Sequence, residues 1–165
     1  MSFEHRLSNV LNGWQKANVS GKLKIVGPVI DYDYAKQVFE IIDKDTSVEY
    51  IEYMDHSELM NMLGTSYATI NSSISEGQSA AVLESMASGV PVIARNIPGN
   101  SFIDDQCGLK FDTIDEMSEK IRLIFDDNQL RDQLGQNARS YIDKHHSFEN
   151  ECEFYRKLIS TVIQT

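Results

Sequence analysis

The stretch "SSISEGQSAAVLESMASGVPVIARNIPGN", residues 72–100, decides the fold. A polar loop leads into small and apolar residues at 79–88, which predict a helix that packs against other elements. Gly89 predicts the end of this helix, because glycine readily adopts the left-handed conformation that follows helix ends. "VPVIAR", residues 90–95, predicts a buried β-strand. Loop, helix and strand in this order are typical of the crossover between two parallel strands.

The same alternation continues on both sides of this stretch. No tight hairpin turn separates the predicted strands, so the pattern favours a parallel sheet. We expect an α/β fold, a Rossmann-like three-layer parallel sheet, with residues 1–165 forming a single domain. Strands are predicted at 22–28, 47–53, 66–73, 90–95 and 107–112, and helices at 5–17, 31–44, 55–64 and 79–88. From residue 114 the pattern is helical almost to the end, with breaks near Gly135 and around 145–148, and we expect these helices to pack as a tail across the domain.

Composition excludes several classes of protein. The chain has 165 residues, of which 41% are hydrophobic, enough for one globular core. A net charge of −10 disfavours nucleic acid and anionic membranes as partners. No apolar run is long enough for a transmembrane segment, and the first residues lack the hydrophobic block of a secretory signal. Cys107 and Cys152 lie far apart without metal-ligand spacing, so we expect reduced thiols in a cytoplasmic protein.

The loop at 72–78 is the first candidate for a binding site. Ligands of parallel sheets collect at the carboxyl ends of the strands, where this loop begins. The helix after the loop presents free N–H groups and a partial positive charge at the same edge, which favour an anion such as a diphosphate. Gly77 lets a ligand approach the backbone, and Ser75 and Ser79 add hydroxyl donors.

Two glutamates accompany this loop. Glu84 lies about five residues into the predicted helix, or roughly 7–8 Å along its axis. Its carboxylate could accept hydrogen bonds from both hydroxyls of a ribose, while Glu76 in the loop could reach the group beyond the phosphates. A glutamate on a helix usually faces solvent, however, and such a pair is expected by chance in a chain this rich in glutamate. A ligand role and a surface role are both open on these residues alone.

"SEGQSAAVLESMASGVPVIA", residues 75–94, resembles the E-x7-E segment of the GT-B retaining glycosyltransferases of family 4, the glycosyl transferases group 1 domain. Residues 22–160 as a whole resemble that domain. The other segments that carry the likeness are "LKIVGP" (23–28), "VEYIEYMDHSELMNMLGTSYATINSS" (48–73), "NIPGN" (96–100) and "GLKFD" (108–112). The resemblance implies the C-terminal, donor-binding half of a GT-B fold, with a C-terminal helical tail.

The same resemblance implies an activity and a set of binding residues. The activity is transfer of a hexosyl group from a nucleotide diphosphate sugar to an acceptor, with retention at the anomeric carbon and without a metal or other cofactor. Glu84 would bind the ribose, and Glu76 would contact the hexose near the reacting carbon. The remaining expected positions are Gly77, Gln78 and Ser79 around the diphosphate or sugar, Tyr53 and Met54 beside the base, and Gly27 and Pro28 on the floor of the cleft.

The sequence also departs from the family pattern. Gln78-Ser79 replaces an aromatic-glycine pair, Glu52 replaces a glycine, and Gly27-Pro28-Val29 replaces a glycine-x-glycine turn. We find no strand with an Arg/Lys pair before the helix at 5–17, and no N-terminal acceptor-binding domain. The isolated chain is therefore expected to be inactive. Arg95 is the one base at the ligand edge that could meet a phosphate, with a surface ion pair as the alternative.

Other functions remain open at this point. The absent Arg/Lys pair favours a non-catalytic nucleotide- or sugar-binding module as the alternative, and a GT-B-like nucleotide-sugar epimerase or phosphorylase is a further one. An NAD-dependent enzyme is disfavoured because no G-x-G-x-x-G follows the first strand. His145-His146 lacks the companions of a metal site and is interpreted as surface. His56 is interpreted as a helix-start residue.

Overall fold

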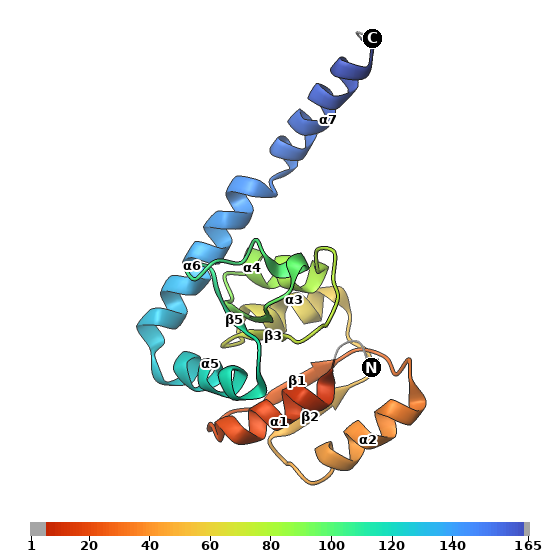
Figure 1. Cartoon of the computed structure of the whole chain (residues 1–165), viewed down its shortest axis with the longest axis vertical. Helices are drawn as coiled ribbons and strands as arrows, with labels where there is room; N and C mark the ends of the chain where they lie inside the picture. Colours follow the sequence, from red (N-terminus) through yellow and green to blue (C-terminus); the bar gives the residue numbers. More distant parts are fainter. Residues whose placement is uncertain (1–5, 164–165) are drawn as a thin grey trace.

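The structure is a computed structural model, and it describes residues 6–163. Five strands alternate with helices, as predicted, and every strand pairing within the described residues is parallel (Figure 1). The strands are β1 (Leu23–Val26), β2 (Val48–Ile51), β3 (Thr69–Asn71), β4 (Val92–Arg95) and β5 (Gly108–Phe111). The predicted α/β class with a parallel sheet is confirmed.

The helices begin where short polar residues precede them. Side chains of Asp31, Thr113 and Asp127 each accept a hydrogen bond from a backbone N–H in the first turn of the helix that follows. The helices are α1 (Leu7–Ala17), α2 (Tyr32–Ile42), α3 (His56–Gly64), α4 (Ala80–Ala87), α5 (Ile114–Asp126), α6 (Asn128–His145) and α7 (Phe148–Ile163). A short 3-10 helix, η2 (Pro98–Asn100), follows β4.

Strand β4 shows the three layers most directly. Its side chains alternate between two apolar clusters, as expected for a strand buried on both faces. Ile93 belongs to a core formed with α1 and α5, whereas Val92 and Ala94 belong to a core formed with α4 and α6. All three side chains are at most 1% exposed. Helices therefore cover both faces of the strand layer.

The strands form two sheets rather than a continuous one. One sheet has the order β1-β2 and the other has the order β3-β4-β5. Helix α1 connects them, because it packs along α5 on one face of the molecule (Figure 1). The Trp14 ring meets the Phe125 ring edge-on at a centroid distance of 5.9 Å. The two sheets thus share one core while their facing edges stay apart.

Helix α6 differs from the prediction of a break near Gly135. The helix is continuous through this residue, and the actual break lies at Asp127, which ends α5 and caps α6. The predicted break around 145–148 is confirmed between α6 and α7. Gly135 instead lies against the turn at Gly89, where a Cβ atom on Gly135 would come within 2.2 Å of the Gly89 carbonyl oxygen. Gly135 therefore does not break the helix; it allows α6 to approach the backbone of the turn after α4 closely.

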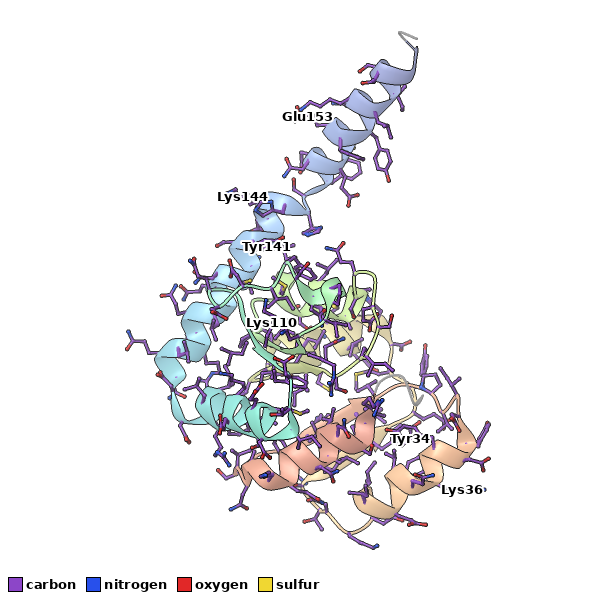
Figure 2. All side chains as sticks on the ribbon, in the orientation of Figure 1. Tyr34, Lys36, Lys110, Tyr141, Lys144 and Glu153 are labelled. Atoms are coloured by element: carbon purple, nitrogen blue, oxygen red, sulfur yellow. The ribbon has the colours of Figure 1, made fainter. Side chains whose placement is uncertain are left out.

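Helix α7 does not pack across the domain as predicted. It projects away from the rest of the molecule (Figure 1), and its labelled residue Glu153 lies far from the sheets (Figure 2). None of its described side chains is buried, and Phe148, Phe154 and Leu158 are at least half exposed. Of the two last helices, α6 packs against α4 and α5, so the tail prediction is correct only for α6.

The two cysteines are free thiols, as predicted. Cys107 is buried, and this burial raises the pKa of its thiol to about 11. Cys152 lies half-buried on α7. Within residues 6–163, none of the helices has the length and apolar character needed to cross a membrane.

Replacing Gly135 with alanine should destabilise the fold. The new methyl group would collide with a backbone carbonyl that cannot rotate away, so we expect Gly135→Ala to lower the free energy of unfolding by about 1–3 kcal/mol. Urea denaturation measures the change. The control is Gly64→Ala at the end of α3, where a Cβ atom would meet nothing within 4 Å. Equal stability of the two variants would contradict the close α6 contact.

Candidate functional site

The turn after β1 is held open by its glycine. Gly27 has a φ of +136°, a conformation that side-chain-bearing residues rarely adopt. A Cβ atom at this position would meet nothing within 4 Å, so the space in front of the turn is free. The Gly27 carbonyl accepts a hydrogen bond from the Tyr50 hydroxyl at 2.8 Å, which fixes the turn to β2. Burial raises the pKa of that hydroxyl above its usual value.

The start of α4 faces the same edge. Ser79 is the residue before the helix, and its hydroxyl caps no N–H group of the first turn. Gly77 and Gln78 are exposed, and a Cβ atom on Gly77 would meet nothing within 4 Å. Glu76 is half-buried beside them. Backbone N–H groups at the start of α4 are thus available to an anion.

A buried hydroxyl attaches α4 to the sheet. Ser85 is fully buried, and its Oγ lies 2.8 Å from Thr69 Oγ1 on β3 and 2.7 Å from the Ala81 carbonyl oxygen. Its neighbour Glu84 therefore takes a defined position on α4, with its side chain 34% exposed. The interpretation of Glu84 as a purely solvent-facing surface residue does not fit this partial burial.

The segment 96–100 packs against the backbone of the loop at 72–78. Gly99 approaches it so closely that a Cβ atom there would lie 2.3 Å from the Glu76 carbonyl oxygen and 2.7 Å from that of Gly77. Asn100 is fully buried, and its Nδ2 donates to the Arg95 carbonyl at 2.9 Å and to Asn71 Oδ1 at 3.3 Å. This supporting role of the 96–100 segment was not predicted from the sequence. The available signal was a Pro-Gly pair next to an asparagine that follows a buried strand.

Glu84 has a partner that the sequence analysis missed. His56 Nε2 lies 3.2 Å from Glu84 Oε1, which connects the first residue of α3 to the middle of α4. The neighbouring Asp55 accepts a hydrogen bond from the Tyr53 hydroxyl at 2.8 Å, and this bond raises the pKa of the tyrosine. Met54, between Tyr53 and Asp55 in the sequence, is half-buried. His56 starts a helix, as predicted, and it also orients the candidate ribose-binding carboxylate.

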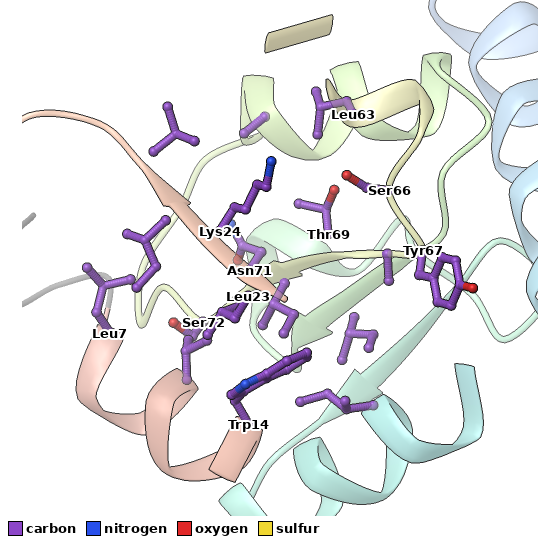
Figure 3. Close-up of a pocket in the computed structure, with 18 of the residues that line it drawn as sticks. Leu7, Trp14, Leu23, Lys24, Leu63, Ser66, Tyr67, Thr69, Asn71 and Ser72 are labelled. Carbon is purple, nitrogen blue, oxygen red and sulfur yellow. The ribbon is translucent and has the colours of Figure 1, made fainter. Parts of the chain in front are cut away.

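A cavity of about 810 Å³ brings one subset of the predicted residues together. Gly27, Pro28, Glu76 and Ser79 line it, and it continues between β1 and β3 (Figure 3). The predicted residues Tyr53 and Met54, which precede α3, and Glu84 on α4 lie outside the lining. Gly77 and Gln78 lie on the exposed loop.

The basic side chains near the site are engaged. Arg95 donates from Nε to the Ser72 carbonyl at 3.3 Å and lies against the Phe111 ring, so it braces the start of the loop rather than forming a surface ion pair. Among the described residues, Lys22 and Lys24 are the basic side chains that line the cavity, and Lys24 Nζ lies 3.9 Å from Glu49 Oε2. Within residues 6–163, no three His, Cys, Asp or Glu side chains lie close enough together to share a metal ion.

Comparison with known proteins identifies the domain. The family model described as "Glycosyl transferases group 1" matches residues 5–141. The chain belongs to the glycosyl transferases group 1 family. A curated relative, glycosyltransferase 1 domain-containing protein 1 from Xenopus tropicalis, is 35% identical over 155 residues, which cover 93% of this chain and 45% of that protein. The chain thus spans less than half the length of this relative.

Solved structures agree on the fold of this glycosyltransferase domain. HepE from Anabaena in complex with UDP-glucose has a TM-score of 0.85 at 14% identity, over 100% of this chain and 47% of that chain. The C-terminal domain of the group 1 protein LpcC from Francisella tularensis has a TM-score of 0.79 at 19% identity, over 90% of this chain and 83% of that domain. The predicted family and the C-terminal GT-B fold are confirmed, while the roles of individual residues stay predictions.

Replacing Gly99 with alanine should loosen the loop. The methyl group would push against two backbone carbonyls, so we expect Gly99→Ala to lower the stability by about 1–3 kcal/mol and to speed hydrogen exchange at the amides of Gly77 and Gln78. Gly77→Ala, whose Cβ atom meets open space, is the matched control and should leave the stability of the fold unchanged. Unaltered exchange in Gly99→Ala would show that the 96–100 segment does not support the loop.

Proposed function

We propose that this chain is the donor-binding domain of a retaining glycosyltransferase, which transfers a hexosyl group from a nucleotide diphosphate sugar to an acceptor. The observation that carries the proposal is the position of Glu84. The chain belongs to the glycosyl transferases group 1 family, and the Glu84 carboxylate contacts His56. Glu84 lies directly after the first turn of α4, whose N–H groups have no side-chain cap. We propose that the start of α4 binds the diphosphate and that Glu84, about one helical turn further along α4, binds the ribose.

The start of α4 would bind the diphosphate. With a net charge of −10, the chain repels anions at long range, so attraction must come from local dipoles. The first-turn N–H groups of α4, the backbone of Gly77 and Gln78, and the Ser79 hydroxyl supply donors at one point. The positive end of the helix then compensates phosphate charge without a metal ion, which is our proposal for this site.

Glu84 would bind the ribose. The contact with His56 uses one of the two carboxylate oxygens, which leaves the other as an acceptor for ribose hydroxyls. Tyr53 and Met54, two to three residues before His56, would then lie beside the base. The Tyr53 side chain is 77% exposed, so its ring is accessible to a nucleotide.

Glu76 would act at the reacting end of the donor. It lines the cavity together with Gly27 and Pro28, beyond the start of α4. We propose that Glu76 orients the hexose at its anomeric carbon, where the bond to the phosphate oxygen breaks and the acceptor oxygen becomes attached with retention. The nucleoside diphosphate leaves and takes up the proton of the acceptor hydroxyl. The acceptor site would lie in a separate domain, so the isolated chain binds donor but does not transfer sugar.

The second candidate function is a nucleotide- or sugar-binding module without transfer activity. The engagement of Lys24 and Arg95 with other groups favours it, because neither side chain is free to neutralise charge on a leaving diphosphate. A nucleotide-sugar epimerase of similar fold is the remaining alternative. Product analysis of a longer protein that contains this domain, incubated with a nucleotide sugar, separates the three. A transferase gives a glycosylated acceptor, a binding module leaves the nucleotide sugar unchanged, and an epimerase converts it into its epimer.

Nucleotide binding tests the proposal. We expect thermal stabilisation of the chain by a nucleoside diphosphate or its sugar conjugate, with UDP and UDP-glucose first in the panel because HepE binds them. A ligand at ten times its dissociation constant adds about 1.4 kcal/mol, or roughly 3–6 °C in a domain of this size. At the same ligand concentration Glu84→Ala should strongly reduce the shift through a higher dissociation constant, whereas Glu40→Ala, which changes an exposed glutamate on α2, should retain it. An unchanged shift in Glu84→Ala would contradict the assignment of the ribose site.

His56 should matter for binding only through Glu84. An exposed hydrogen bond contributes about 0.5–1.5 kcal/mol, so His56→Ala should weaken nucleotide binding by about 2–10-fold in isothermal titration. In the Glu84→Ala background the same change should have no further effect, as a double-mutant cycle will show. Additive losses would mean that His56 contacts the ligand independently of Glu84.

A further inference from the structure

Helix α7 carries a large exposed apolar surface. Five of the eleven large hydrophobic side chains that are exposed within residues 6–163 belong to this helix, and each of the five is at least 50% exposed. They are Phe148, Phe154, Tyr155, Leu158 and Ile159. The helix projects away from the sheets, so nothing in the rest of the described chain covers them (Figure 1). Apolar side chains gathered on one exposed element mark an interaction surface.

The helix has an apolar face and a charged face. Four of its residues follow one another at intervals of four, three and four positions, which places them in one stripe along the helix. This stripe consists of Phe148, Cys152, Tyr155 and Ile159. On the opposite face Lys157 Nζ lies 2.7 Å from Glu153 Oε1, and both side chains are at least 61% exposed. The charged face is therefore the one that suits solvent, and the stripe is the one that a partner would cover.

The spacing within the stripe is the same in both directions along the helix. Intervals of four, three and four residues read identically in reverse, so a second α7 in antiparallel orientation presents a matching stripe. With a two-fold axis between residues 153 and 154, Phe148 of each copy meets Ile159 of the other, and Cys152 meets Tyr155. Such a two-fold pair is closed, because each copy uses the same surface.

The charges beside the stripe favour the antiparallel orientation. Glu149 and Arg156 are seven positions apart, so they lie on the same flank of the stripe, about 10 Å from each other along the axis. In an antiparallel pair equal flanks adjoin, and Glu149 of each copy comes beside Arg156 of the other. A parallel pair would instead bring Glu149 beside Glu151 of the other copy. The helix dipole accounts for acids in the first turn, but it does not account for Arg156 in the middle of the helix.

We propose that α7 is a self-association surface, at which two copies of this chain pair their α7 helices in antiparallel orientation. The inference is independent of the proposed function, because it rests on α7 alone. The sheets of the two copies would lie at opposite ends of the helix pair, which keeps the two net charges of −10 apart beyond the range of unscreened repulsion. The 16 residues of α7 form a helix of about 24 Å, so the interface is small and association depends on concentration.

Sedimentation equilibrium of the whole chain tests the pairing, over concentrations from about 10 to 500 µM. The variants are Glu149→Arg, Arg156→Glu and the combination of both changes. Residues 149 and 156 are two helical turns apart and cannot pair within one helix, so a rescue by the combination reports a contact between copies. Glu153→Arg, on the charged face, is the matched control. Circular dichroism verifies that each variant keeps its helix content.

We expect a dimer whose dissociation constant rises about fivefold or more in each single variant, because each change occurs twice in the pair and replaces attraction by repulsion. The combination should restore the original value within about twofold, and Glu153→Arg should leave it unchanged.

Single variants that associate like the original chain, or a combination that fails to restore association, would overturn the proposal. Tighter association of Glu149→Arg alone would indicate a parallel pair and overturn the antiparallel arrangement. A chain that stays monomeric at every concentration would also overturn it, and would assign the stripe to another occupant, such as the polypeptide that the curated relative has beyond this chain.

Discussion

The parallel pairing of β3 with β4 is the constraint on which the candidate site depends. Thr69 lies opposite Val92, and the connection between the two strands must therefore cross the sheet as a helix. That helix is α4, and its start is carried to the carboxyl edge together with the loop that holds Glu76 and Gly77. Ser85 then fixes the rotation of α4 against β3, which determines where Glu84 lies.

Support for the site comes from several sides. The 96–100 segment contacts the backbone of the loop at 72–78, and Arg95 donates a hydrogen bond to the Ser72 carbonyl where this loop begins. His56 on α3 contacts Glu84 on α4. None of these contacts places a free positive charge at the proposed diphosphate position. In a chain with a net charge of −10, binding of an anion would therefore rely on oriented backbone N–H groups rather than on a basic surface.

The sequence was sufficient for the elements and for much of the site. Apolar runs, polar cap residues and glycines located the five strands found within residues 6–163, because these signals act over a few neighbouring residues. Contacts between distant segments could not be predicted in this way. Gly135 on α6 lies against Gly89 in the turn after α4, and His56 reaches Glu84 over a separation of 28 residues. The position of α7 depends on which surface is present to cover its apolar side chains, which local periodicity does not encode.

The two sheets illustrate the same limit. Each strand has the sequence pattern of a buried parallel strand, so the pattern alone suggested one sheet. Which strands pair is decided by backbone hydrogen bonding between segments, and here β1 and β3 face each other without pairing. Side chains of α1, α3, α4 and α5 line the cavity between these two strands.

The most direct measurement of the central claim is NMR chemical-shift mapping of the isotope-labelled chain with saturating UDP. The account predicts perturbations concentrated at the Gly27–Pro28 turn, at residues 76–80 and around Glu84, with Tyr53 also affected. No perturbation at millimolar nucleotide, or perturbations confined to other surfaces such as α6 and α7, would contradict a nucleotide site at the start of α4.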